Sequence, residues 1–183
     1  MIDEKKVQGA LELDNFEATF FAQKIGWFDS ESPRHFVHVY SQLALAHLYG
    51  LEGRKKSFKL TMRYLERGIS LGSGDCANEL SKLYKSDTWW WGKPKKEKSD
   101  QEYEKWRKKA VELWAWEADN LNDTYAAYKI FHAYRPLRGQ NNPDPFRDKL
   151  KAEKWRDKTI ELSNASGDEY ASIVLKYEKD GRA

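Results

Sequence analysis

The stretch Trp106–Leu113, with the sequence WRKKAVEL, carries a pattern that occurs three times in the chain. It recurs as YLERGISL at residues 64–71 and as WRDKTIEL at residues 155–162. Each copy begins with an aromatic residue, has a basic residue at its fourth position and a β-branched residue at its sixth, and ends in leucine. Self-similarity at a spacing of tens of residues is the mark of a repeat protein. The pattern therefore predicts a series of stacked helical units.

A second feature is repeated at the C-terminal ends of the helices that pair with the copies of this pattern. Each of these helices ends in a tyrosine, and an aliphatic residue stands four positions before it. The four tyrosines are Tyr49, Tyr84, Tyr134 and Tyr177. Their spacing is wider in the later units, which predicts insertions there. A single helix pair cannot bury its own apolar stripe, and stacking against neighbouring pairs buries it.

These features predict an all-α fold. No stretch alternates convincingly with a period of two, so we expect no sheet. We predict a right-handed α/α solenoid of about four helix pairs, with insertions in the later repeats, that forms one domain over residues 1–183. Its parts would be an N-terminal capping helix, three helix pairs and a C-terminal capping helix. Their predicted ranges are 1–28, 33–72, 75–120, 123–164 and 168–181.

Several helix starts carry residues that cap backbone amides. Serine or aspartate before a helix accepts from its unpaired amides, and proline suits the first helical position. In a capping box, Ser and Glu three residues apart accept from each other's amides. The predicted starts lie at Ser32–Pro33, Asp75, Ser99–Glu102, Asp144–Pro145 and Gly167–Asp168.

Composition narrows the classes of partner. The chain has 32 basic and 29 acidic residues, a net charge of +3, and charged residues make up 33% of it. Such a mixed surface weakly disfavours nucleic acid, because domains that bind it usually concentrate positive charge on one face. The single cysteine, Cys76, excludes an intramolecular disulfide and fits a reducing compartment. No apolar run is long enough for a membrane span or follows Met1 as in a signal peptide, so we expect a cytoplasmic protein without membrane insertion.

The helix pairs resemble the Sel-one-like repeat family, α/α repeats related to tetratricopeptide repeats. In the family's second helix an aromatic residue is followed by Lys-Ala-Ala-Glu, which here reads Trp106 and then Lys109–Glu112. In its first helix an alanine precedes Leu-Gly and then a tyrosine, which here become Ala77, Leu80–Ser81 and Tyr84. The resemblance covers roughly residues 33–181.

This resemblance implies a function as well as a fold. Family members serve as adaptors or scaffolds that bind proteins, and small bacterial members suggest immunity proteins that neutralise a cognate toxin. The chain departs from the family at the glycine that lets the two helices approach closely. In its place stand Ala46, Ser81, Phe131 and Val174.

Motifs for catalysis or metal binding are missing from the sequence. His35 and His38 are three positions apart, but no thiol or carboxylate follows at a metal-ligand spacing. Carboxylates are interleaved with Lys and Arg, as on a solvated helix face. No phosphate-binding loop, nucleophile elbow or His-Glu-x-x-His helix occurs. We predict that the chain is not an enzyme and has no catalytic residue, metal or cofactor.

The candidate contact residues for a protein partner form two groups. Trp89, Trp90 and Trp91 lie in an insertion; three consecutive rings cannot share one face, so at least one is expected to project as a binding anchor. Equally, two of these rings could fold back beside Trp106 or Trp116. A basic run at residues 93–98 leaves nucleic-acid binding as an alternative. The second group is a polar strip on the first helices of the pairs: Tyr40, His47, Glu79, Lys82, Tyr125, Lys129 and His132.

Overall fold

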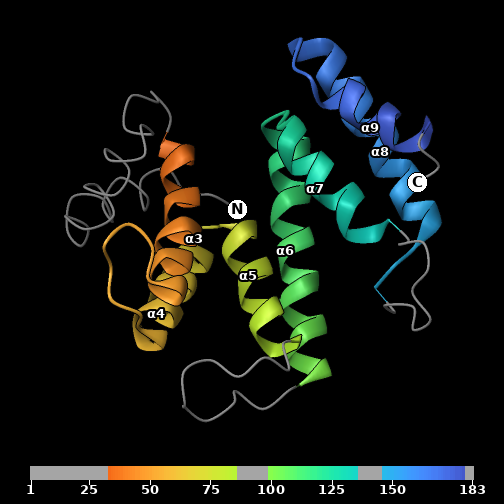
Figure 1. The fold of residues 1–183 in the computed structure, drawn as a ribbon. Coiled ribbons are helices and arrows are strands. Elements are labelled where there is room, and N and C mark those ends of the chain that lie inside the picture. Colours follow the sequence, from red (N-terminus) through yellow and green to blue (C-terminus); the bar gives the residue numbers. More distant parts are fainter. Residues whose placement is uncertain (1–32, 86–98, 136–145, 180–183) are drawn as a thin grey trace. The chain divides into compact units, whose positions relative to one another are not determined.

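Seven α-helices make up most of the described chain (Figure 1). The computed structural model describes residues 33–85, 99–135 and 146–179, and these contain no strand. The all-α prediction is confirmed for this part of the chain. No helix in it is long and apolar enough to cross a bilayer. The helices are α3 (Pro33–Tyr49), α4 (Phe58–Ser70), α5 (Gly74–Lys85), α6 (Asp100–Asn120), α7 (Thr124–Tyr134), α8 (Lys149–Ser166) and α9 (Tyr170–Lys179).

The chain divides into two compact units, residues 1–110 and 111–183, and the boundary falls inside α6. The single repeat domain that was expected over the whole chain stays a prediction. Each unit has its own helix packing and its own buried side chains.

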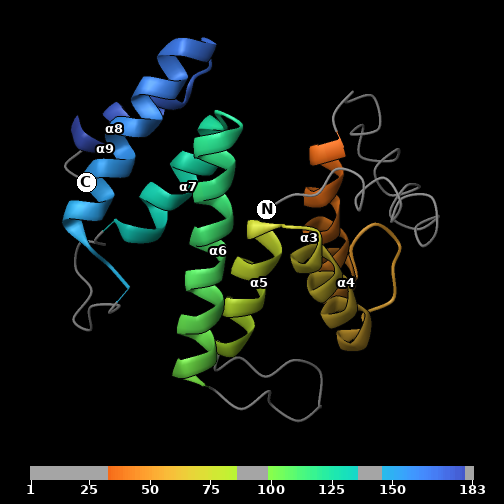
Figure 2. The same cartoon turned by 180° about the vertical axis from the view of Figure 1, so that it is seen from behind.

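The first unit packs through a small-residue contact. Helix α4 lies against both α3 and α5, and α3 also contacts α5 (Figure 2). A Cβ atom on Gly68 of α4 would overlap Sγ of Cys76 on α5 and would lie 3.0 Å from Cβ of Tyr40 on α3. Three helices therefore meet at Gly68 because it has no side chain. The close approach that the resemblance assigns to a glycine of the first helix is made here by a glycine of the second.

Helix starts in the first unit follow local capping, with one correction. Helix α3 begins at Pro33 as predicted. Ser57 caps α4, and its Oγ accepts from the amide three residues on at 3.3 Å. The predicted cap of α5 at Asp75 is wrong, because Ser73 Oγ accepts from the Cys76 amide at 3.1 Å. The Asp75 carboxylate instead pairs with His38, 37 residues earlier in the chain.

One hydrogen bond of the capping box predicted before α6 is present. Ser99 Oγ accepts from the amide of Glu102 at 3.2 Å, as predicted. The Glu102 carboxylate also accepts from Lys105 Nζ at 3.1 Å and from the Trp106 indole nitrogen at 2.9 Å. Two donors one turn further along α6 thus bind this carboxylate, and the aromatic residue that opens the repeated pattern is one of them.

The second unit packs through larger side chains. Helix α8 lies against α7 and α9, and α7 contacts α9. A buried cluster of Phe131, Ala152 and Val174 joins the three helices, and Trp155 is among the partly buried residues around it. Phe131 and Val174 occupy the place of the family's packing glycine. Their burial shows that bulky residues fill this interface.

Aspartates open the helices of the second unit. Asp123 caps α7 and accepts from Ala126 N at 3.0 Å. Helix α8 begins at Lys149 with Asp148 as its cap. The start predicted at Asp144–Pro145 lies outside the described residues. Gly167 ends α8 with φ at 75°, a left-handed conformation that favours glycine.

Arg147 ties the segment before α8 to the end of α7. Its Nη1 donates to the carbonyl oxygens of His132 at 2.7 Å, Ala133 at 3.2 Å and Arg135 at 2.8 Å. The last carbonyls of a helix have no partner within it, so this guanidinium supplies one. Nearby, the rings of Tyr134 and Phe146 stack in parallel, with centroids 5.1 Å apart.

Candidate protein-interaction surface

Two of the predicted contact residues in the first unit are buried. Tyr40 is fully buried, and its ring centroid lies 6.5 Å from that of Tyr64. His47 is also buried and stacks on Tyr64 at 5.5 Å. The prediction that these two side chains form part of an exposed strip is therefore wrong, because both fill the contact between α3 and α4. A partner cannot reach them in this structure.

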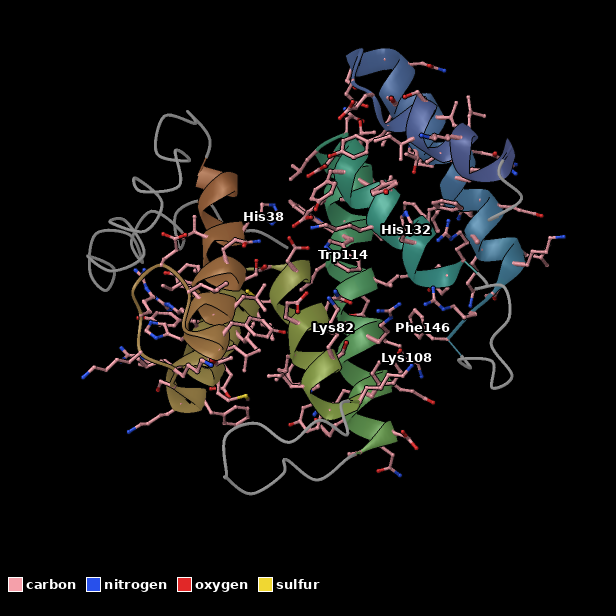
Figure 3. The ribbon with its side chains drawn as sticks, viewed as in Figure 1. His38, Lys82, Lys108, Trp114, His132 and Phe146 are labelled. Carbon is pink, nitrogen blue, oxygen red and sulfur yellow. The ribbon has the colours of Figure 1, made fainter. Side chains whose placement is uncertain are left out.

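The other two predicted residues of the first unit lie on the surface of α5. Lys82 Nζ and Glu79 Oε1 form an ion pair at 2.6 Å, and Lys82 is exposed (Figure 3). Such pairs contribute little to stability, typically below about 1 kcal/mol. Trp89, Trp90 and Trp91 lie outside the described residues.

Three tyrosines of the second unit come together on α7 and α9, and we call Tyr125, Tyr128 and Tyr170 the tyrosine cluster. The ring centroids of Tyr125 and Tyr128 are 6.4 Å apart. Tyr170 lies 5.5 Å from Tyr125 and 5.1 Å from Tyr128. Tyr125 is 43% exposed, while the other two rings are half-buried. The cluster thus presents one open ring supported by two partly packed ones.

Local structure explains how the rings meet. Residues three apart on a helix share a face, which places Tyr125 beside Tyr128. Tyr170 begins α9, and its amide donates to Asp168 Oδ1 at 3.1 Å. Ser163 Oγ on α8 donates to the same carboxylate oxygen at 2.6 Å. Asp168 therefore fixes the start of α9, and with it the third ring, against α8.

The charge on Asp168 is stabilised by these contacts. Burial tends to raise the pKa of its carboxyl group, but hydrogen bonds from Ser163, Ser166 and the Tyr170 amide outweigh burial and lower the pKa to about 2. For the Tyr170 hydroxyl, burial comes first, and the neighbouring Tyr125 and Asp168 add to it in raising the pKa. The phenol therefore keeps its proton at neutral pH and can donate to a partner.

Lys129 and His132 border the tyrosine cluster. The Nζ atom of Lys129 lies 3.9 Å from the ring centroid of Tyr125 and 5.6 Å from that of Trp114. Figure 3 marks Trp114 on α6 and His132 on α7. A cation over aromatic rings is attracted to their faces, which holds this lysine against the cluster. His132 meets Tyr128 edge-on at 4.5 Å.

His132 is uncharged at neutral pH. Burial of the imidazole comes first, and the positive charges of Arg135 and Arg147 add to it, in lowering its pKa to about 4. The side chain therefore adds no positive charge beside the tyrosine cluster. The positive charge beside the tyrosine cluster comes from Lys129.

The structure brings together three predicted contact residues, Tyr125, Lys129 and His132, but two members of the tyrosine cluster were missed. Tyr128 could have been found from its three-residue spacing to Tyr125. No local signal connects Tyr170 to α7, because the contact depends on how α9 packs.

Among residues 33–85, 99–135 and 146–179, no three His, Cys, Asp or Glu side chains come together as metal ligands do. The tyrosine cluster and Lys129 offer a partner aromatic faces, hydroxyl groups and one positive charge. No protein-family model, curated protein or solved structure matches the chain.

Proposed function

We propose that the chain is a non-enzymatic protein-interaction protein, and that the tyrosine cluster contacts its partner. The observation that carries the proposal is the exposed Tyr125 ring, which Tyr128, Tyr170 and Lys129 hold in place. Tyrosine is enriched at binding hot spots. It offers a large contact area at a small cost in side-chain entropy, and a ring already held by neighbours loses still less on binding.

We further propose that the helix pairs form a right-handed α/α solenoid of Sel-one-like type. Helix α4 packs on α3 and α5, and α8 packs on α7 and α9, as stacked pairs require. The repeated aromatic pattern falls on α4, α6 and α8, while Tyr49 and Tyr134 end α3 and α7. This alternation supports a unit made of one helix of each kind.

The partner we favour is a cognate bacterial toxin in the cytoplasm, with the chain as its immunity protein. The support is the resemblance, together with an exposed aromatic contact surface and no motif for catalysis. A general adaptor or scaffold is the second candidate, because the same surface serves either role. Binding of nucleic acid through the basic run at residues 93–98 ranks third.

The proposal can be tested by affinity capture from the source cell. The bait is the full chain, beside Tyr125→Ala/Tyr170→Ala and the matched variant Tyr125→Phe/Tyr170→Phe, which keeps both rings. We expect a stoichiometric protein that the alanine variant binds at least about 30-fold more weakly, because hot-spot truncations cost about 2 kcal/mol or more. The phenylalanine variant should retain most of the binding.

The captured protein then separates the candidate roles. If it is toxic when expressed alone and harmless when expressed with the chain, it is a toxin and the immunity role holds. A captured protein without toxicity indicates an adaptor. Retention of nucleic acid alone, or equal capture by the alanine variant in its folded form, would contradict the role of the tyrosine cluster.

A further inference from the structure

The connection between α3 and α4 is held in one shape by several hydrogen bonds. Leu51 N donates to the Ala46 carbonyl at 2.9 Å, and Ser57 N donates to the His47 carbonyl at 2.9 Å. The Lys55 carbonyl lies 3.3 Å from Nδ1 of the buried His47. Residues 50–57 are therefore fastened to the end of α3 at both sides. They stand on the side of the α3–α4 pair away from α5 (Figures 1 and 2).

Left-handed backbone conformations shape this loop. Gly50, Glu52 and Gly53 have φ values of 71°, 55° and 73°. At Gly50 a Cβ atom would come within 2.8 Å of Lys56 Cγ, so the lysine stem lies against the glycine. The resulting tight turn carries Leu51 between two left-handed residues.

Three large apolar side chains are exposed at this end of the unit. Leu51 is 52% exposed, and Tyr49 and Phe58 are each 43% exposed. Tyr49 is the last residue of α3 and Phe58 the first residue of α4, so the two rings flank the loop that carries Leu51. Single exposed apolar residues are ordinary, but three on and beside one fixed loop favour a binding surface.

Basic residues are frequent in this loop and in the first turns of α4. Lys55, Lys59 and Arg63 are exposed and have no ion-pair partner in the described part of the chain. Lys59 and Arg63 are four positions apart and so share one face of α4. Residues 50–63 contain five basic residues and one acidic residue, although the whole chain has a net charge of only +3. Positive charge is thus concentrated in the stretch of sequence that carries Leu51 and Phe58.

We propose that Tyr49, Leu51 and Phe58, with Lys55, Lys59 and Arg63, form a second docking surface that binds the acidic face of a protein partner. We call it the loop surface. It goes beyond the proposed function, because it lies in the first unit and shares no residue with the tyrosine cluster. Apolar anchors with a charged rim match the anatomy of protein interfaces. The rim steers a partner of opposite charge, and the anchors provide the contact area.

The exposed apolar side chains favour a protein over a nucleic acid, because phosphate groups contact basic residues but offer Leu51 no aliphatic surface. A protein face can place apolar side chains opposite Leu51 and acidic groups opposite Lys59 and Arg63.

The test measures binding of the full chain to a defined acidic probe by isothermal titration calorimetry or anisotropy. The probe is the peptide EELEELFEELEE, and KKLKKLFKKLKK serves as its charge-reversed control. Lys59→Glu/Arg63→Glu should weaken binding of the acidic peptide about 10-fold or more at low salt. The control Lys154→Glu/Lys176→Glu makes the same change in net charge on α8 and α9 and should weaken it less than about 3-fold.

A second variant separates docking from charge alone. Leu51→Ser leaves the charge unchanged and should still weaken binding about 5-fold, because an apolar anchor is lost. Its backbone amide bond to Ala46 remains, and circular dichroism checks the fold. Equal losses in the two charge-reversal variants, or unchanged binding by folded Leu51→Ser, would overturn the proposal.

The same variants also test the other occupants. Vesicles of phosphatidylcholine with 30% phosphatidylserine and a 20-nucleotide single-stranded RNA are titrated in parallel. Tighter binding of either than of the acidic peptide, lost in Lys59→Glu/Arg63→Glu, would replace the protein partner by that class of ligand. Self-association that the same variant abolishes would replace it by a second copy of the chain.

Discussion

The two units solve the same packing problem with different side chains. In the first, α4 reaches its neighbours because Gly68 leaves room for Tyr40 and Cys76. In the second, Phe131 and Val174 fill the interface that joins α8 to α7 and α9. A small-residue contact has little tolerance for added volume, whereas an interface of larger side chains depends on keeping them in place. The repeated pattern therefore specifies the order of the helices but not the chemistry between them.

The largest effect is expected from adding one methyl group at the small-residue contact of the first unit. Gly68→Ala should destabilise the chain by about 3 kcal/mol, because the new Cβ overlaps Cys76 Sγ and crowds Tyr40. Without the overlap, alanine would favour a helix by about 1 kcal/mol over glycine. Urea unfolding followed by circular dichroism measures the change, and hydrogen exchange should place it on α3 to α5.

A matched glycine separates overlap from backbone strain. Gly53 has a φ of 73°, but a Cβ atom there would meet nothing within 4 Å. Gly53→Ala should therefore cost only about 1 kcal/mol, from the left-handed backbone alone. The double variant Gly68→Ala/Cys76→Gly should be more stable than the single variant Cys76→Gly, because the sulfur atom that the new methyl group would overlap is gone. Equal losses at the two glycines would contradict the tight contact.

The next largest effect is expected in the second unit. Arg147→Met should cost about 2 kcal/mol, because it leaves the carbonyls of His132, Ala133 and Arg135 without their shared donor. The loss should appear as faster hydrogen exchange in α7 and α8 while α3 to α5 keep their protection. Arg147→Lys should recover only part of the loss, since an ammonium group lacks the planar fork of guanidinium. Full recovery by lysine would contradict the role of that geometry.

An effect of similar size depends on pH. The pKa of His132 falls from an ordinary 6.5 to about 4, so the unfolded chain binds more protons between these values. Stability of the second unit should therefore fall as the pH is lowered from about 6.5 to about 4, by about 2 kcal/mol after allowance for partial exposure. His132→Gln removes the titrating group and should flatten this pH dependence in urea unfolding. A profile unchanged by the substitution would assign the acid sensitivity to other groups.

Asp168 should affect stability at a lower pH than His132 does. The pKa of Asp168 is lowered to about 2, so the stability that its ionised form contributes is present above about pH 3.8 and is lost between 3.8 and 2. Loss below pH 3.8 should persist in His132→Gln. A single transition over the whole range would mean that the two groups are coupled.

Local signals in the sequence were sufficient for the helices that the structure describes between residues 33 and 179, but not for every helix start, and the capping helix predicted over residues 1–28 lies outside the described residues. Pro33 and Tyr49 bound α3 as expected, because proline and periodic apolar residues act over a few positions. Ser73 and Asp75 are both good caps, and the choice between them depends on His38 in another helix. Sequence alone cannot weigh a contact between residues so far apart.

The candidate site was predicted only where its residues share a helix. Tyr125, Lys129 and His132 lie on α7, and their spacing placed them on one side. Tyr170 comes from α9, and no periodic pattern links it to that side. His47 shows the opposite error, because a polar residue that was expected at the surface is buried against Tyr64. The loop surface was missed because its exposure depends on a turn that apolar periodicity does not describe.

Glu52 connects two properties of the loop that are usually considered apart. A side chain other than glycine or asparagine in the left-handed region costs roughly 1 kcal/mol, and Glu52 has a φ of 55°. On backbone conformation alone, glycine would suit this position better. The glutamate side chain makes an interaction of its own and places a carboxylate beside Leu51. Replacing it with glycine would therefore relieve backbone strain and change the charge of the loop surface at the same time.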